Sequence, residues 1–376
     1  MDFGFTVFKL FPHGGLGRDL LRIANALIER GHTVRVYAID WLGDVPPGIE
    51  VVRLEARGIT IRARIASFVA QLVPALESRP CDAIVGFNRM PGLDVYYAAD
   101  VCHAAALRDR AFPLHRLTPR HRLYLRYERE VFDPRSSTEI LVLAEQEMEN
   151  YIRCYGTPRE RFHLLPPGID LERVRPDDAD RRRELARASL RVSKDEMLLL
   201  LVGSNFALKG LDRALGAVAA LPEPVRSRTM LGVVGKDAPA RWQRRARRLG
   251  IGDRVRFLGL RDDVSDLLLA ADLLIHPAVR ENTGTVILEA IVAGLPVIAT
   301  ETCGYSPHIV RAEAGAVVSS RPFDQGELDR RVLELLQPER LVELQANALR
   351  YARSADLHGL VERAVDAIET VARRGR

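Results

Sequence analysis

The sequence lacks any apolar stretch that approaches the roughly 20 residues a membrane-spanning helix requires. Its apolar segment 3–11 is interrupted by Lys9, and no small-residue cleavage site follows it. We therefore expect a first β-strand there rather than a signal peptide. The chain is also poor in cysteine, and its four cysteines are scattered without a C-x-x-C pair. Such spacing is typical of reduced thiols in a cytoplasmic protein and argues against a zinc site.

The chain has 376 residues, of which 47% are hydrophobic and 28% are charged. This length suits two domains better than one, and the composition is that of a globular protein with sizeable cores. Strand-like apolar runs alternate with amphipathic helical patterns in both halves, starting at 3–10 and again at 197–202. Such repetition predicts an α/β fold in which helices cover both faces of a parallel sheet.

The boundary between the two halves is marked by a change of composition. The strand–helix alternation breaks at 164–168, and a charged stretch with Asp and Arg follows at 177–183. Proline, glycine and charge together indicate a linker. We therefore place one domain at 1–168 and a second at 169–355, and we expect the remaining segment, 356–376, to form a C-terminal helix.

Positive charge is unevenly distributed along a chain whose formal net charge is +5. Arginine is densest in the segment 103–132, where it is interleaved with leucine and tyrosine. The arginines expected to act there include Arg116, Arg120, Arg122 and Arg126. A basic helix of this composition can lie on an anionic membrane surface, which is our interpretation. A solvated face and a nucleic-acid contact are the alternatives. A second basic cluster, 241–248, fits the exposed face of one helix.

Glu281 and Glu289 flank the start of a predicted helix that follows a strand-like run at 272–277. Thr283 or Gly284 is the expected N-cap, so the first N–H groups of the helix point at the loop. A helix N-terminus binds phosphate, and carboxylates accept hydrogen bonds from sugar hydroxyls. Phosphate and hydroxyls together describe a nucleotide sugar. The spacing of the pair also arises by chance, but its place at the end of a strand favours a site.

Other candidates lie at the ends of predicted strands. Gly14 and Gly15 follow the first strand, where glycine allows a tight turn and the close approach of a ligand; a purely structural turn is the alternative. Lys209 opens a helix and suits a diphosphate, although it can equally be an ordinary surface lysine. Asp100 suits a substrate contact or proton acceptor, or a helix cap. Asp19 lies one turn into the first helix, where it faces either a ligand or solvent.

Longer motifs surround these residues. They are F-P-x-G-G-L-x-R-D at 11–19, G-F-N-R-M-P-G-L-D-V-Y-Y-A-A-D at 86–100, L-L-P-P-G-I at 164–169, L-K-G-L-D-R at 208–213, H-P-A-x-x-E-N-T-G-T-V at 276–286 and C-G-Y at 303–305. Together they resemble the retaining GT-B glycosyltransferases, the family that includes glycogen synthases. Within that family the resemblance is greatest to the glucosyltransferases of the lipopolysaccharide core, and it covers nearly the whole chain.

The resemblance implies a GT-B fold, with two Rossmann-like domains facing a central cleft and C-terminal helices packing back on the N-terminal domain. It implies transfer of glucose from UDP-glucose to a heptose of the lipopolysaccharide inner core, with retention and without a metal or other cofactor. The enzyme would lie in the cytoplasm, peripherally on the inner face of the inner membrane. Its partners would be the UDP-sugar donor, the core acceptor and the anionic membrane surface, with no nucleic acid.

The resemblance also assigns roles to the donor-site residues. Glu281 would bind hydroxyls of the donor sugar, and Glu289 would bind the ribose hydroxyls of UDP. Lys209 would hold the pyrophosphate and neutralise charge on the departing UDP, with N–H groups of Thr285 and Val286 completing the phosphate site.

Residues elsewhere in the chain are assigned supporting roles. Related enzymes often carry an arginine before the lysine, but 204–208 supplies no cation, so Arg173 is expected as the second one. From the N-terminal domain the residues expected at the diphosphate and sugar are Gly14, Gly15 and Asp19. Asp100 would lie near the acceptor, where either it or the leaving phosphate takes the proton. With Lys209 and Glu281 it completes the predicted catalytic set.

Three alternatives remain at this stage. A related transferase could use UDP-galactose, UDP-N-acetylhexosamine or GDP-mannose, since few contacts near Glu281 distinguish the orientation of a hydroxyl. A UDP-sugar epimerase of the same fold would turn over the donor alone. A nucleic-acid-binding module would show affinity that falls steeply with salt, and Glu281 would be dispensable for it.

Overall fold

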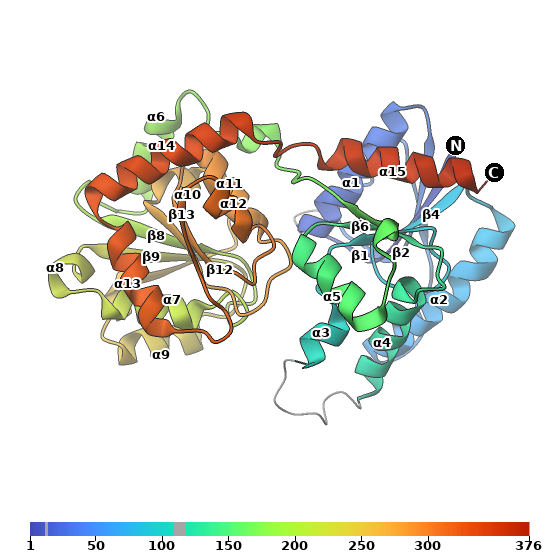
Figure 1. Cartoon of the computed structure of the whole chain (residues 1–376), viewed down its shortest axis with the longest axis horizontal. Coiled ribbons are helices and arrows are strands. Elements are labelled where there is room, and N and C mark those ends of the chain that lie inside the picture. Colours follow the sequence, from blue (N-terminus) through green and yellow to red (C-terminus); the bar gives the residue numbers. More distant parts are fainter. Residues whose placement is uncertain (12–13, 109–117, 376) are drawn as a thin grey trace. The chain divides into compact units, whose positions relative to one another are not determined.

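The computed structural model describes residues 1–11, 14–108 and 118–375 (Figure 1). The chain divides into two compact units, one formed by 1–168 together with 358–376 and the other by 169–357. No helix in the described part of the chain is both long enough and apolar enough to cross a membrane.

The first unit is built on a parallel sheet with the strand order β3-β2-β1-β4-β5-β6-β7. The strands are β1 (Asp2–Leu10), β2 (Thr33–Trp41), β3 (Ile49–Arg53), β4 (Ala83–Gly86), β5 (Val95–Ala98), β6 (Glu139–Val142) and β7 (Phe162–Leu164). The helices are α1 (Gly15–Glu29), α2 (Ile61–Ser78), α3 (His103–Arg108), α4 (Pro119–Phe132), α5 (Glu145–Tyr155) and α15 (Leu360–Arg374). Separate apolar clusters cover the two faces of this sheet, as parallel sheets require.

The C-terminal helix α15 packs against α1 in the first unit, and the two lie side by side in Figure 1. Apolar side chains from both helices share one core with β1. Around this core, Arg30 pairs with Asp366 at 2.8 Å, and His32 Nε2 lies 3.0 Å from Glu369 Oε1. Burial raises the pKa of Glu369, but hydrogen bonds from His32 and Arg30 outweigh it and lower the pKa. These contacts fix the last helix onto the N-terminal sheet, as the resemblance implied.

The second unit has a parallel sheet with the strand order β10-β9-β8-β11-β12-β13. Its strands are β8 (Met197–Val202), β9 (Thr229–Val234), β10 (Val255–Gly259), β11 (Leu273–His276), β12 (Val297–Thr300) and β13 (Gly315–Val318). Its helices are α6 (Ala179–Ser189), α7 (Leu211–Ala220), α8 (Glu223–Arg226), α9 (Ala240–Arg248), α10 (Val264–Ala270), α11 (Thr285–Ala293), α12 (Ser306–Arg311), α13 (Gln325–Leu335) and α14 (Pro338–Ser354).

Both faces of the second sheet are buried. Along β8, Leu198 and Leu200 belong to one apolar cluster, whereas Leu199 and Leu201 belong to the cluster on the other face. This explains why the strand has a continuous apolar sequence instead of an alternating one. The prediction of an α/β fold with two Rossmann-like parallel sheets is confirmed.

Candidate functional site

The centre of the candidate site lies at the carboxyl ends of β8 and β11, which are neighbours in the second sheet. Lys209, in the loop before α7, donates a hydrogen bond to Glu281, in the loop after β11. His276, the last residue of β11, is fully buried and places Nε2 3.3 Å from the same carboxylate oxygen, Oε2 of Glu281. The Lys209 side chain is 22% exposed and that of Glu281 is 14% exposed. The two charges therefore remain open to a ligand.

The environment of Glu281 keeps its carboxylate ionised. Burial by itself raises the pKa of this group, but the hydrogen bond with His276 and the charge of Lys209 outweigh burial and lower the pKa to about 2. The neighbouring thiol of Cys303 behaves differently, since burial and the negative charge of Glu281 raise its pKa to about 12. Cys303 is therefore protonated at neutral pH and is not an activated nucleophile. His276 was not among the predicted site residues, although it ends a predicted strand and begins the motif at 276–286.

Two glycines give the loops their form. Gly210, with a φ of +77°, is the N-cap of α7, and a Cβ there would collide with the carbonyl oxygen of Pro277 after β11. Because only glycine avoids both the strain and the collision, the loop of Lys209 lies directly against the loop that leads to Glu281. Gly284, with a φ of +74°, is the N-cap of α11, one of the two caps that the sequence offered.

The amino end of α11 supplies hydrogen-bond donors next to this pair. The N–H groups of Thr285 and Val286 lie in the first turn, where they have no acceptor within the helix. Glu289 is one turn further on and is 6% exposed. It forms an ion pair with Arg173, whose Nη1 lies 2.7 Å from Oε1 of Glu289. Arg173 therefore neutralises Glu289 in this structure, and its predicted role as a cation for the diphosphate stays a prediction.

The glycine-rich segment of the first unit differs from the expected turn. The helix α1 begins at Gly15, inside the glycine-rich segment, with Gly14 as N-cap in an extended conformation that any residue can adopt. An added Cβ at Gly15 would meet nothing within 4 Å. The glycine that the packing requires is Gly17, because a Cβ there would collide with the carbonyl oxygen of Phe11. Ligand contacts at Gly14 and Gly15 stay predictions.

Two carboxylates of the first unit lie near the carboxyl ends of its strands. Asp19 accepts a hydrogen bond from the hydroxyl of Tyr97 at 2.7 Å, so it is not a purely solvated acid. The side chain of Asp100 is 66% exposed, with Oδ2 3.9 Å from Nη2 of Arg89. Asp100 does not cap the helix that follows it, because Glu128 accepts the hydrogen bonds of the first N–H groups of α3. The Asp100 carboxylate is thus accessible to a substrate.

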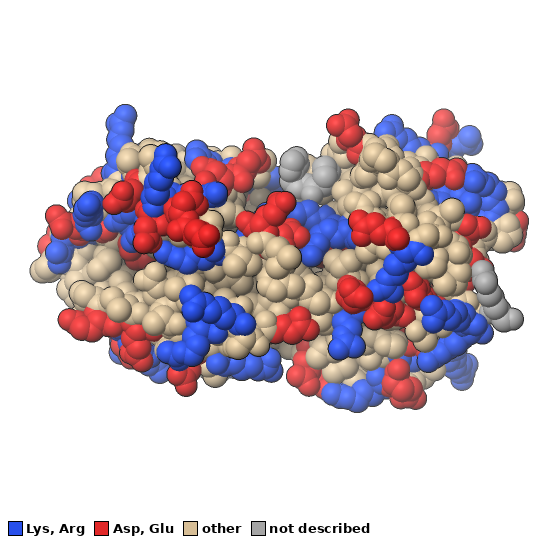
Figure 2. All heavy atoms as spheres, turned by 90° about the horizontal axis from the view of Figure 1, so that it is seen from above, with Lys and Arg blue, Asp and Glu red and all other residues tan. Residues whose placement is uncertain are grey.

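The basic segment 103–132 contains α3 and α4, and its residues 109–117, with Arg116, lie outside the described part. Arg120, Arg122 and Arg126 are exposed on α4, whereas the opposite side of this helix is buried in the core. Elsewhere the charges are mixed: Figure 2 shows Lys and Arg interspersed with Asp and Glu on the face it presents. The positive formal charge is not gathered into one area on that face.

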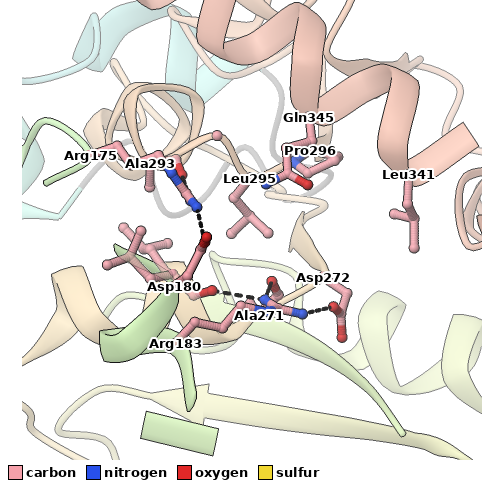
Figure 3. Close-up of a pocket in the computed structure, with 13 residues that line it drawn as sticks. Arg175, Asp180, Arg183, Ala271, Asp272, Ala293, Leu295, Pro296, Leu341 and Gln345 are labelled. Atoms are coloured by element: carbon pink, nitrogen blue, oxygen red, sulfur yellow. Dashed lines mark hydrogen bonds and ion pairs between the residues drawn. The ribbon is translucent and has the colours of Figure 1, made fainter. Parts of the chain in front are cut away.

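A pocket of about 250 Å³ lies at the amino ends of β11 and β12, opposite the candidate site (Figure 3). Arg183 donates there to the carbonyl oxygens of Leu269 and Ala271, at 2.8 and 2.7 Å, and forms an ion pair with Asp272. Arg175 pairs with Asp180 at 2.7 Å. Both guanidinium groups are thus engaged by groups of the protein itself. Ligands of open parallel sheets also bind at the carboxyl ends of the strands, not at the amino ends. This pocket is therefore not the candidate site.

Comparison with known proteins identifies the family. The model of "Glycosyl transferases group 1" matches residues 182–355, and that of "Glycosyltransferase Family 4" matches 13–173. The chain is 42% identical over 370 residues to the lipopolysaccharide glucosyltransferase WaaG of Escherichia coli (strain K12), and the match covers 98% of each chain. The chain belongs to this glycosyltransferase family. It is a hexosyltransferase, and the predicted resemblance to enzymes of the lipopolysaccharide core is confirmed.

Solved structures agree with this assignment to the glycosyltransferases. A crystal structure of WaaG, described as a glycosyltransferase involved in lipopolysaccharide biosynthesis, is 42% identical, with a TM-score of 0.92, and covers 97% of this chain and 99% of its own. Anabaena HepE in complex with UDP-glucose is only 20% identical, with a TM-score of 0.76, and covers 98% of this chain and 100% of its own. The second likeness shows the fold alone. The predicted GT-B fold class is confirmed.

Proposed function

We propose that this glycosyltransferase moves glucose from UDP-glucose to a heptose of the lipopolysaccharide inner core, with retention and without a metal. The observation that carries the proposal is the pairing of Lys209 with the ionised Glu281 at the amino end of α11. It offers a cation and helix N–H groups to a diphosphate, and a carboxylate to sugar hydroxyls. The E. coli relative is a lipopolysaccharide glucosyltransferase, which supports the choice of glucose and of a lipopolysaccharide acceptor.

The donor would bind with its diphosphate at Lys209 and at the N–H groups of Thr285 and Val286. Glu281 would accept hydrogen bonds from the sugar hydroxyls, and Glu289 from the ribose. As the bond between the sugar and the diphosphate breaks, negative charge grows on the departing UDP. Lys209 and the amino end of α11 neutralise that charge, which is electrostatic stabilisation of the transition state.

Retention follows if the acceptor hydroxyl attacks from the face that UDP leaves and gives its proton to the leaving phosphate oxygen. No carboxylate nucleophile is needed, unlike the two-carboxylate route of retaining glycosidases. Asp100 is the other candidate for the proton, since its side chain is 66% exposed at the carboxyl edge of the first sheet.

A panel of donors tests the proposal. With purified, deacylated core oligosaccharide as acceptor, we expect transfer from UDP-glucose and little from UDP-galactose, UDP-N-acetylglucosamine or GDP-mannose, as measured by mass spectrometry of the acceptor. Preferred transfer from another of these sugar nucleotides would change the assigned donor, but the enzyme would still be a glycosyltransferase. Conversion of UDP-glucose without any acceptor, followed by NMR, would instead show an epimerase and contradict the proposal.

We also propose that the segment 103–132 binds the cytoplasmic face of the inner membrane. Reversing the charges of Arg116, Arg120, Arg122 and Arg126 to glutamate should release the protein from anionic vesicles in a sedimentation assay, because each basic residue near an anionic surface contributes about 1 kcal/mol. The matched control reverses four exposed arginines of α9, Arg241, Arg244, Arg247 and Arg248. Equal sedimentation of both variants would exclude a specific role for this segment.

A further inference from the structure

A second pocket, of about 520 Å³, is lined by residues of the first unit. It lies where β1, β4 and β5 end, and α3 and α4 form its other side. Asn88 and Asp100 line it from the loops that follow β4 and β5, His103 begins α3, and Arg120, His121 and Tyr124 lie on the first turns of α4. Parallel sheets bind ligands at this edge.

Groups that suit an anion converge in this pocket. His103 Nε2 and His121 Nδ1 are 3.0 Å apart and share one hydrogen bond. In a neutral imidazole the ring that accepts this bond carries its N–H on the other nitrogen. The guanidinium of Arg120 lies 5.4 Å from the ring centre of Tyr124, and it forms no ion pair with any described residue. The pair and this arginine can hold an oxyanion between them.

The remaining arginine of the pocket is already neutralised. Arg89 lies 2.7 Å from Glu128 and donates to the carbonyl oxygen of Val101 at 2.7 Å. Glu128 is completely buried and also accepts the N–H groups of His103 at 2.8 Å and Ala104 at 2.9 Å. A carboxylate of α4 therefore fixes the first residue of α3, which holds His103 against His121. The histidine pair is built into the fold and does not depend on flexible surface side chains.

Two other side chains suit sugar hydroxyls. Asn88 accepts the N–H of Phe8 through Oδ1 at 2.7 Å, so the orientation of its amide is fixed and its NH2 group is the remaining donor. The Asp100 carboxylate is an acceptor, and its Oδ2 lies 3.9 Å from Nη2 of Arg89. Hydroxyl-binding groups and an anion-binding set within one pocket together match a sugar that carries an acidic substituent.

We infer that this pocket is a subsite for an anionic sugar residue of the acceptor, whose phosphate or carboxylate group is held by the His103–His121 pair and Arg120. This inference rests on the proposed function only in taking the sugar to be part of the glycosyl acceptor. The anionic group is recognised by charge-assisted hydrogen bonds, which are about twice as strong as those between neutral partners. The pocket thus selects acidic acceptors, whereas the site in the second unit binds the donor.

The test compares Arg120→Gln with Arg129→Gln, an exposed arginine of the same helix that does not line the pocket. With deacylated core acceptor, Arg120→Gln should raise the acceptor KM about 10-fold or more and leave the UDP-glucose KM unchanged, because one hydrogen bond to a charged group is lost. Arg129→Gln should behave like the wild type. His121→Gln should resemble Arg120→Gln, and thermal unfolding checks that each variant is folded.

The source of the anion is found with modified acceptors. Phosphatase treatment removes phosphates, and carboxyl reduction removes carboxylates. The treatment that removes the bound group should raise the acceptor KM of the wild type as much as Arg120→Gln does. The same treatment should raise the acceptor KM of Arg120→Gln little further, because the treatment and the substitution remove the same interaction. Equal KM values for all acceptors, or equal effects of Arg120→Gln and Arg129→Gln, would overturn the inference.

Direct binding separates this inference from the proposed function. NMR titration with glucose 6-phosphate, glucuronate and glucose needs no catalysis. Wild type should bind at least one of the two acids more tightly than glucose, and Arg120→Gln should lose that preference. If no core acceptor is glucosylated but this preference is found, the proposed function fails and the anionic subsite stands. If glucose is transferred but neither acid binds more tightly than glucose, the subsite is contradicted and the proposed function stands.

Discussion

Replacing Glu281 with alanine should abolish transfer, with kcat falling by a factor of about 10³ or more, while the second unit remains folded. The expected size follows from removing a preorganised charged group from an active site, where one such group is worth about 10² to 10³ in rate. Glu281 acts in two ways in our proposal, since it binds sugar hydroxyls and also positions the ammonium of Lys209. Losing both roles should exceed the cost of losing one hydrogen bond.

The controls separate charge from shape. Because the pKa of Glu281 lies at about 2, its carboxylate is ionised at any pH used for assay, and Glu281→Gln removes the charge with little change in size. The kcat of Glu281→Gln should therefore be higher than that of Glu281→Ala. Glu339→Ala, at an exposed position of α14 in the same unit, should transfer glucose normally. Near-normal transfer by Glu281→Ala, with an unchanged circular dichroism spectrum, would refute the assignment of the site.

Replacing Lys209 with alanine should lower kcat by a factor of about 10² to 10³ and weaken the binding of UDP. Lys209 is the cation that we place at the diphosphate, and it is only 22% exposed, so its charge acts through partly desolvated surroundings. Lys209→Arg keeps the charge but not the compact ammonium, and it should recover only part of the rate. Stopped assays for kcat and calorimetry for the Kd of UDP measure the two effects.

The pairing of Lys209 with Glu281 also predicts how the two variants combine. Groups that act as a unit are not additive, so the double variant should be hardly slower than the slower single variant. Lys194→Ala, at an exposed position in the same unit, should leave both kcat and the Kd of UDP unchanged. A double variant whose loss is the product of the two single losses would mean that Lys209 and Glu281 act independently.

Much of the fold was accessible from local patterns. Alternating apolar strands and amphipathic helices predicted two parallel sheets, because each pattern depends on a residue and its near neighbours. The same locality explains why Gly284 was among the expected N-caps and why Lys209 was placed at the start of a helix. Local patterns did not predict the role of Gly17 at the start of α1, where glycine is required because the carbonyl oxygen of Phe11 lies against it.

The sequence by itself determined the fold class and nominated Lys209 and Glu281, since glycine, proline and apolar spacing fix where strands end and helices begin. Only the tertiary structure decided that these two side chains meet, that His276 supports them, and that His103 lies against His121. The physical reason is that such contacts depend on which strands become neighbours. β8 and β11 pair across many intervening residues, and that choice is made by the packing of the whole unit.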